Sequence, residues 1–111
     1  MSLPIPTEKA EQIHFVRYLR LKNIDHFHVP NSTWTKSIKQ KVSNKAMGVS
    51  PGVPDLFLIV KDKLYAIEMK RQKGGQLRDS QKRWIKKLNE ANVKTVVCNG
   101  CEEAIKFVES I

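Results

Sequence analysis

The sequence predicts an α/β fold in which a central mixed β-sheet is flanked by helices. Two observations lead to this prediction: short apolar runs alternate with segments of helical periodicity, and one stretch has the order strand, helix, strand. Strands joined through a helix run parallel, whereas strands joined by a tight turn run antiparallel, so both directions are expected. With 111 residues, the chain is expected to form a single domain over residues 1–111.

The first part of the chain predicts two helices separated by a short strand. Thr7 suits the N-cap of an amphipathic helix over residues 8–21. Residues 26–30 are β-like and end in proline. The lysine-rich stretch over residues 34–47 repeats apolar side chains at helical spacing, which predicts a basic helix that ends at Gly48.

The second part predicts three strands and two helices. Residues 55–60 form an apolar run bounded by turn residues, as is typical of a central strand, and residues 64–70 return after a tight turn. A strongly amphipathic helix follows over 79–91, then a strand over 94–98 and a last helix over 102–110. The strands at 64–70 and 94–98 should therefore be parallel neighbours.

The charge balance favours a polyanionic partner. Twenty Lys and Arg residues oppose eleven Asp and Glu residues, which gives a formal charge of +9. Such an excess attracts nucleic acid, and its spread along the chain indicates a folded binding face rather than a basic tail. No apolar run is long enough to span a bilayer, and the first residues lack a signal-peptide pattern. We therefore expect a cytoplasmic protein without a membrane partner.

The two cysteines, Cys98 and Cys101, have the spacing of redox and zinc motifs. A structural zinc ion would need two more ligands, which only His14, His26 and His28 could supply. The pair also follows the last expected strand, whereas a thioredoxin-like motif would lie near the start of its β-α-β unit. We expect Cys98 to be a small core residue and Cys101 to begin a helix, with a thiol oxidoreductase as a rival reading.

Two polar residues interrupt a strand that should be buried. Glu68 and Lys70 are two positions apart and therefore point to the same face of the strand over residues 64–70. Leu64 and Ala66 share that face, so it is expected to be the inward one. Because burying a carboxylate beside an ammonium group is costly, this pair indicates a functional site.

A second carboxylate converges on this pair. If the strands over 55–60 and 64–70 form a hairpin, loops of two to four residues set Asp55 opposite Glu68, Met69 or Lys70. The loops of even length place Asp55 on the face of Glu68. Hard oxygen ligands arranged in this way suit Mg²⁺ or Mn²⁺, and a neighbouring lysine can stabilise charge that develops on a phosphate.

The spacing of these residues resembles a known nuclease motif. Pro54-Asp55, twelve residues and Glu68-Met69-Lys70 resemble the PD-(D/E)xK nuclease superfamily. The segments at 48–56, 67–71 and 74–81 more narrowly resemble the VRR-NUC family, in the small standalone form of phages and prophages. This resemblance implies a restriction-endonuclease-like core and a bacterial or phage-infected cell.

The resemblance also implies roles for individual residues. It makes Asp55, Glu68 and the Met69 backbone carbonyl metal ligands, Lys70 the catalytic lysine and Gln81 a catalytic helix residue. Gln81 could instead be a polar group that satisfies the start of its helix. The family also uses a glutamate on the first helix, which should be Glu8, with Glu11 as a competitor. The basic residues expected to bind DNA are Lys36, Lys39, Lys41, Lys45, Arg71 and Lys73.

The expected function is the hydrolysis of DNA phosphodiester bonds with Mg²⁺ or Mn²⁺ and no organic cofactor. Because the resembled family reads DNA structure more than sequence, branched DNA such as a four-way (Holliday) junction is the expected substrate, and a homodimer the expected assembly. The alternatives are a flap endonuclease, a restriction enzyme and a basic DNA-binding module without activity. The last explains the charge but leaves Asp55, Glu68 and Lys70 without a reason.

Overall fold

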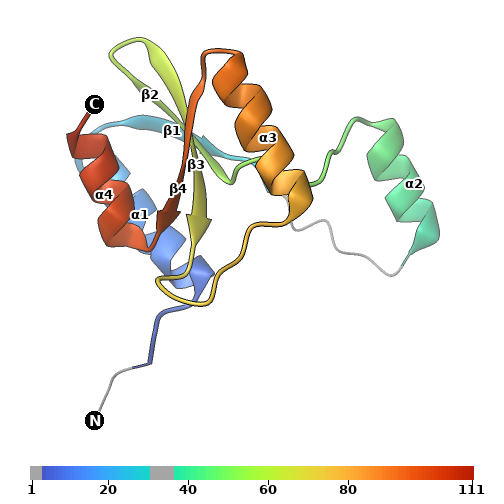
Figure 1. The fold of residues 1–111 in the computed structure, drawn as a ribbon, viewed down its shortest axis with the longest axis horizontal. Helices are drawn as coiled ribbons and strands as arrows, with labels where there is room; N and C mark the ends of the chain where they lie inside the picture. The colour runs from blue at the N-terminus through green and yellow to red at the C-terminus, as the bar shows by residue number, and fades with distance from the viewer. Residues whose placement is uncertain (1–3, 31–36) are drawn as a thin grey trace.

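The computed structural model describes residues 4–30 and 37–111. Its four strands form one sheet in the order β1-β2-β3-β4, in which β1, β2 and β3 are antiparallel neighbours and β3 and β4 are parallel (Figure 1). The mixed α/β prediction is therefore confirmed. The elements are α1 (Glu8–Leu21), β1 (Asp25–His28), α2 (Ile38–Ala46), β2 (Leu56–Val60), β3 (Lys63–Lys70), α3 (Asp79–Glu90), β4 (Lys94–Asn99) and α4 (Cys101–Glu109).

The element boundaries follow local sequence signals closely. The Thr7 side chain accepts a hydrogen bond from the Ala10 backbone nitrogen at 3.1 Å, so α1 begins at the predicted cap. The helix predicted over 34–47 is present as α2, although residues 34–36 lie outside the described part of the chain. No helix of the described residues is long and apolar enough to cross a membrane.

The turn between β2 and β3 sets the register of the hairpin. Lys61 and Asp62 both have positive φ, 52° and 66°, which is the backbone of a two-residue turn whose twist matches that of the strands. Val60 consequently pairs with Lys63, and the ladder runs to Leu56 opposite Ile67. One step further along this register lie Asp55 and Glu68, on the same face, as an even-length loop requires.

The apolar core lies on the sheet face opposite to Glu68 and Lys70. α1 and α4 cover that core face together, and α3 lies against the other face near β4 (Figure 1). The buried core residues are Phe15, Leu19, Leu56, Leu58, Ile67, Met69, Cys98, Ala104 and Val108. The main core therefore lies on the other face of the sheet, and the prediction that the face of Glu68 and Lys70 would be the inward one holds only in part.

The face that carries Glu68 is covered at one end only. Ala66 is fully buried there, but Leu64 is 37% exposed, which corrects the prediction for that residue. On the neighbouring strands Phe27 and Ile59 are 47% and 46% exposed, and the Phe27 ring stacks on Phe57 with centroids 5.1 Å apart. α3 has no fully buried residue, because it rests on the sheet through one half-buried stripe.

Candidate functional site

Three carboxylates from separate parts of the chain meet at one end of the two central strands, β2 and β3. Asp55 directly precedes β2, Glu68 lies near the end of β3, and Glu8 is the first residue of α1. One oxygen from each of these three groups lies within 4.8 Å of the others. The structure thus brings together the predicted pair, Asp55 and Glu68, and places Glu8 rather than Glu11 beside them.

Two oxygens of this acidic cluster are buried without a hydrogen-bond partner in the described residues, namely Asp55 Oδ2 and Glu68 Oε2. Burial, followed by repulsion from Asp55, raises the pKa of Glu68 to about 8. Burial and the nearby Glu8 raise the pKa of Asp55, against the lowering effect of a Met69 backbone hydrogen bond. Uncompensated buried oxygens of this kind fit a divalent cation, which would satisfy both and remove the repulsion.

Lys70 and Gln81 complete the polar side of the acidic cluster. Gln81 Nε2 donates to Glu68 Oε1 at 2.8 Å, and Lys70 Nζ donates to Gln81 Oε1 at 3.2 Å. Lys70 Nζ is also 3.8 Å from Glu68 Oε1, and both side chains are almost fully buried. The Gln81 amide therefore fixes the lysine and the carboxylate relative to each other.

Gln81 also satisfies the start of its helix, because Oε1 accepts the Arg78 backbone N–H at 2.8 Å. The sequence left two roles open for Gln81, a helix cap and a site residue, and its side chain makes the contacts of both. Since the cap fixes the amide orientation, Nε2 is directed at Glu68 and Oε1 remains available to Lys70.

Gly52 holds the start of α3 against the loop that enters β2. A Cβ at this position would lie 2.7 Å from the Gln81 backbone nitrogen and closer still to the Ser80 carbonyl group. Its φ of +88° is also a conformation that favours glycine. Sequence patterns alone do not reveal this contact of Gly52 with α3, because it depends on how the two segments pack.

We expect Gly52→Ala to destabilise the fold by about 2 kcal/mol or more, since backbone strain and overpacking each cost about 1–3 kcal/mol. The displaced α3 should also move Gln81 and so reduce activity. Thermal unfolding and cleavage assays measure both effects. Gly48→Ala is the matched control, because Gly48 has φ +91° but no atom within 4 Å of its Cβ position. Equal stability of the two variants would contradict the proposed contact.

Glu11 occupies a different environment from Glu8, although both lie on α1. Its side chain is 4% exposed, and Oε2 would lie 2.7 Å from a Cβ at Gly100, the N-cap of α4. The Gly100 backbone N–H in turn donates to the Lys70 carbonyl at 2.9 Å. Glu11 therefore lies beside the junction between β3 and α4, outside the acidic cluster, and its Oε2 is buried without a hydrogen-bond partner among the described residues.

His28 is a neighbour of Asp55 that the sequence did not single out for the site. Its Nδ1 lies 2.8 Å from the Asp55 carbonyl oxygen and 3.2 Å from Gln12 Nε2. One ring nitrogen cannot donate to a carbonyl and accept from an amide at once, and the shorter contact assigns the proton to Nδ1. The ring therefore holds the Asp55 backbone. Only the β1–β2 pairing, which the sequence did not predict, reveals this contact.

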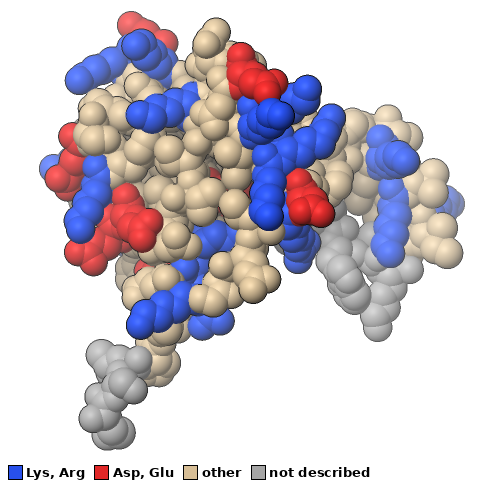
Figure 2. Space-filling model, in the orientation of Figure 1, with Lys and Arg blue, Asp and Glu red and all other residues tan. Residues whose placement is uncertain are grey.

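The basic residues expected to contact DNA lie in two exposed segments. Arg71 and Lys73 follow β3 directly, next to Lys70, and are exposed. Lys39, Lys41 and Lys45 are exposed on α2, and Lys36 lies outside the described residues. Figure 2 shows lysine and arginine side chains over α3 and α2, with no acidic side chain on the visible surface of α2.

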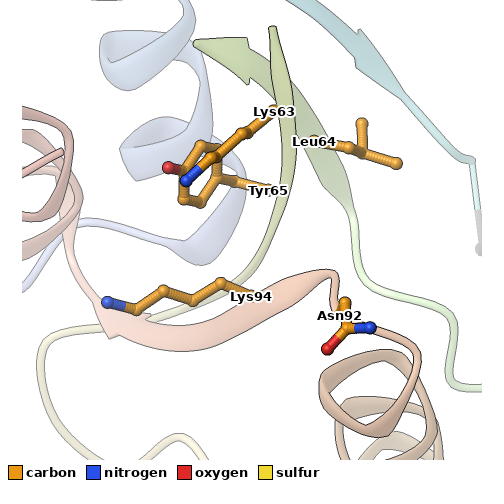
Figure 3. Close-up of a pocket in the computed structure, with 5 residues that line it drawn as sticks. All are labelled: Lys63, Leu64, Tyr65, Asn92 and Lys94. Atoms are coloured by element: carbon orange, nitrogen blue, oxygen red, sulfur yellow. The ribbon is translucent and has the colours of Figure 1, made fainter. Parts of the chain in front are cut away.

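A separate pocket of about 430 Å³ lies at the opposite end of β3 from Glu68. Its lining residues are Lys63, Leu64, Tyr65, Asn92 and Lys94, and Figure 3 shows Leu64 directed to the other side of the strand from Tyr65. Lys94 Nζ lies 5.6 Å from the centre of the Phe107 ring. Because no carboxylate lines it, this pocket is chemically distinct from the acidic cluster.

Neither cysteine lies in an environment that lowers the pKa of its thiol. Both are free thiols, Cys98 is buried in the core and Cys101 is the first residue of α4, as expected. Burial, with a smaller contribution from Glu103, raises the pKa of Cys98 to about 12, and burial raises that of Cys101 as well. Since catalytic thiols need a lowered pKa, a thiol oxidoreductase is disfavoured.

The raised pKa of Glu68 predicts how stability depends on pH. Without metal, the folded state holds this proton up to about pH 8, whereas the unfolded state releases it near 4.5. Stability should therefore fall as pH rises from 4.5 to 8. In EDTA at pH 8, we expect the melting temperature of Glu68→Gln to be higher than that of the wild-type protein by roughly 4 °C or more, the shift that about 1 kcal/mol produces.

The same measurement at pH 5 is the control, because Glu68 is protonated in the folded protein there and the two proteins should differ less. Mg²⁺ at pH 8 is expected to raise the melting temperature of the wild-type protein and not that of Glu68→Gln. A Glu68→Gln protein that is less stable than wild type at pH 8 without metal would contradict the assigned repulsion.

Comparisons with known proteins agree with the fold. The VRR-NUC domain model matches residues 7–102. A solved structure of a VRR_NUC domain protein superposes with a TM-score of 0.81, covers 97% of this chain and 89% of the other, and is 22% identical in sequence. At that identity the likeness shows the fold. A search of the curated proteins gave no match.

Proposed function

The chain belongs to the VRR-NUC domain family, a family of nuclease domains, and we propose that it is an endonuclease that hydrolyses DNA phosphodiester bonds with Mg²⁺ or Mn²⁺. The observation that carries this proposal is the acidic cluster of Glu8, Asp55 and Glu68, with two buried, unsatisfied oxygens beside Lys70. A nucleic-acid-binding protein without catalytic activity would have no use for such costly groups in its fold.

Each residue of the acidic cluster has a proposed role. Asp55, Glu68 and the Met69 carbonyl would hold the metal ion, with Glu8 as a further oxygen donor from α1. When bound, the ion would supply positive charge to the phosphate and lower the pKa of a water molecule. The Lys70 ammonium would stabilise negative charge on the phosphate oxygens, and Gln81 would hold Lys70 and Glu68 in place through both ends of its amide.

Branched DNA is the proposed substrate. The chain's surplus of positive charge, a formal +9, fits recognition of the phosphate backbone, which carries shape but no direct sequence information. A four-way junction is the first choice and a flap the second.

A panel of labelled DNAs tests this function directly. Duplex, single-stranded, flap and four-way substrates are incubated with Mg²⁺, with Mn²⁺ and with EDTA, and the products are separated on denaturing gels. Metal-dependent cleavage of branched DNA above duplex is expected. Binding of all substrates without cleavage under any metal condition would leave the non-catalytic DNA-binding module as the function.

We also expect a homodimer in solution before DNA is added. Resolving a four-way junction needs cuts on two opposing strands, and two copies related by a two-fold axis would provide two sites. The exposed Phe27 and Ile59 side chains provide apolar surface that association could bury. Light scattering at micromolar concentration measures the assembly, and product mapping on a mobile junction should show symmetric paired nicks. A strict monomer that cuts only flaps would overturn this prediction.

A further inference from the structure

α2 stands apart from the other described helices and strands. It packs against no other helix or strand within residues 4–30 and 37–111, and Figure 1 shows it set apart from the sheet and the other helices. Ile38 and Val42 are 77% and 63% exposed. Isolated helices shorter than about 12–15 residues are marginal in water, and α2 has nine. Within the described residues α2 has local caps, such as the Ser37 side chain, but no packing on another helix or strand, so an outside contact would stabilise it.

The charge of this segment points to a polyanion. The sequence has no acidic residue between Asp25 and Asp55, and α2 carries three exposed lysines. A surface with cations and no anions matches the phosphates of a nucleic acid.

The distribution of side chains around α2 fits a nucleic acid groove. Ile38, Val42 and Ala46 follow one another at i, i+4 spacing and form a narrow apolar ridge. Lys41 and Lys45 form the next row on one side of the ridge, and Lys39 lies on the other side. The major groove of a duplex is complementary to this arrangement. Base edges and methyl groups form its floor, opposite the apolar ridge, and a phosphate strand runs along each wall, opposite the lysines.

The lysine row borders a cleft that is also lined by the chain segment after α2. Lys41 and Lys45 line a cleft of about 740 Å³ together with Ser50 and Pro51. The next residue, Gly52, contacts the start of α3 at Ser80 and Gln81, and Gln81 is hydrogen-bonded to Glu68 and Lys70. A phosphate strand seated in this cleft would thus be held on the chain segment that enters the acidic cluster.

We infer that α2 is a nucleic-acid-binding helix that lies in the groove of a duplex arm and is stabilised by that contact. The inference rests on the proposed function, because both use the same substrate, but it concerns binding of the duplex arm rather than cleavage. The ridge faces the groove floor, and the lysines contact phosphates on both strands.

Variants that remove lysine charges test duplex binding by α2 in the absence of metal and of cleavage. The triple variant Lys39→Gln, Lys41→Gln, Lys45→Gln is compared with a control triple at the far end of the sheet, Lys22→Gln, Lys61→Gln, Lys63→Gln. Duplex affinity is measured by fluorescence anisotropy in EDTA over a range of salt concentrations. The α2 triple should bind at least about tenfold more weakly at 0.1 M salt and lower the salt slope by up to about 2.7, three phosphate contacts at about 0.9 each. Equal losses in both triples would overturn the inference.

A ridge variant distinguishes DNA from a second copy as the occupant. Ile38→Gln with Val42→Gln should weaken duplex binding while leaving the salt slope unchanged, because no phosphate contact is removed. Amide exchange over residues 37–47 should slow when duplex is added and not when protein concentration alone is raised. Slowing with protein concentration alone, together with a smaller assembly for the ridge variant in light scattering, would assign the face to a second copy and overturn the inference.

Two outcomes separate the inference from the proposed function. If the α2 triple loses duplex affinity but no substrate is cut, the helix binds DNA and the nuclease proposal fails. If branched DNA is cut and the α2 triple binds as well as wild type, the nuclease proposal stands and the role of α2 is wrong.

Discussion

Glu68→Ala is expected to lower the rate of DNA cleavage by at least about a thousandfold, since a catalytic metal supplies several kcal/mol and each 1.36 kcal/mol is a factor of ten. Glu68 contributes a buried oxygen with no partner among the described residues and faces Asp55 across the hairpin. Without it, Asp55, Glu8 and the Met69 carbonyl would hold the ion weakly. The lysines of α2 are remote from Glu68, so DNA binding in EDTA should be nearly unchanged.

Cleavage kinetics, calorimetric titration with Mn²⁺ and a gel shift in EDTA measure these three properties. Asp55→Ala should behave in the same way as Glu68→Ala. Glu11→Gln is the matched control, because Glu11 is an equally buried carboxylate outside the acidic cluster. The control should retain metal binding and most activity. Full cleavage by either alanine variant would remove the assignment of that carboxylate as a ligand.

The centre of the site could be predicted from sequence because its geometry is set locally. A two-residue turn at Lys61 and Asp62 fixes the hairpin register, and strand periodicity then places Asp55, Glu68 and Lys70 on one face. Only the choice among loop lengths was open. The family resemblance likewise singled out Gln81 as a site residue, and in the structure it contacts Glu68.

The remaining contacts depend on how distant elements pack, which periodicity cannot decide. Glu8 and Glu11 are three residues apart on one helix, and only the angle at which α1 crosses the sheet sends Glu8 to Asp55 and Glu11 to Gly100. The contact of His28 with Asp55 requires the β1–β2 register. The core lies on the face opposite to Glu68 because α1 and α4 both pack there. The alternation of residues within the strands does not show which face of the sheet these helices will cover.

Lys70→Ala is expected to lower the turnover rate by at least about a hundredfold, the lower range for removal of one preorganised electrostatic group. The ammonium group is nearly buried and lies 3.2 Å from Gln81 Oε1, so it is already in position before the substrate binds. Such a group acts on the transition state, and its loss should change kcat far more than metal-free DNA affinity.

The pH profile supplies a second readout, because the Lys70 charge lowers the pKa of both Asp55 and Glu68. In Lys70→Ala these carboxyl groups should hold their protons to higher pH, so the acidic limb of the cleavage profile and of Mn²⁺ binding should both move upward. Lys63→Ala is the control on the same strand, since Lys63 is exposed at the opposite end of β3. A Lys70→Ala protein with near-normal kcat, an unchanged pH profile and weakened DNA binding would make this lysine a phosphate anchor instead.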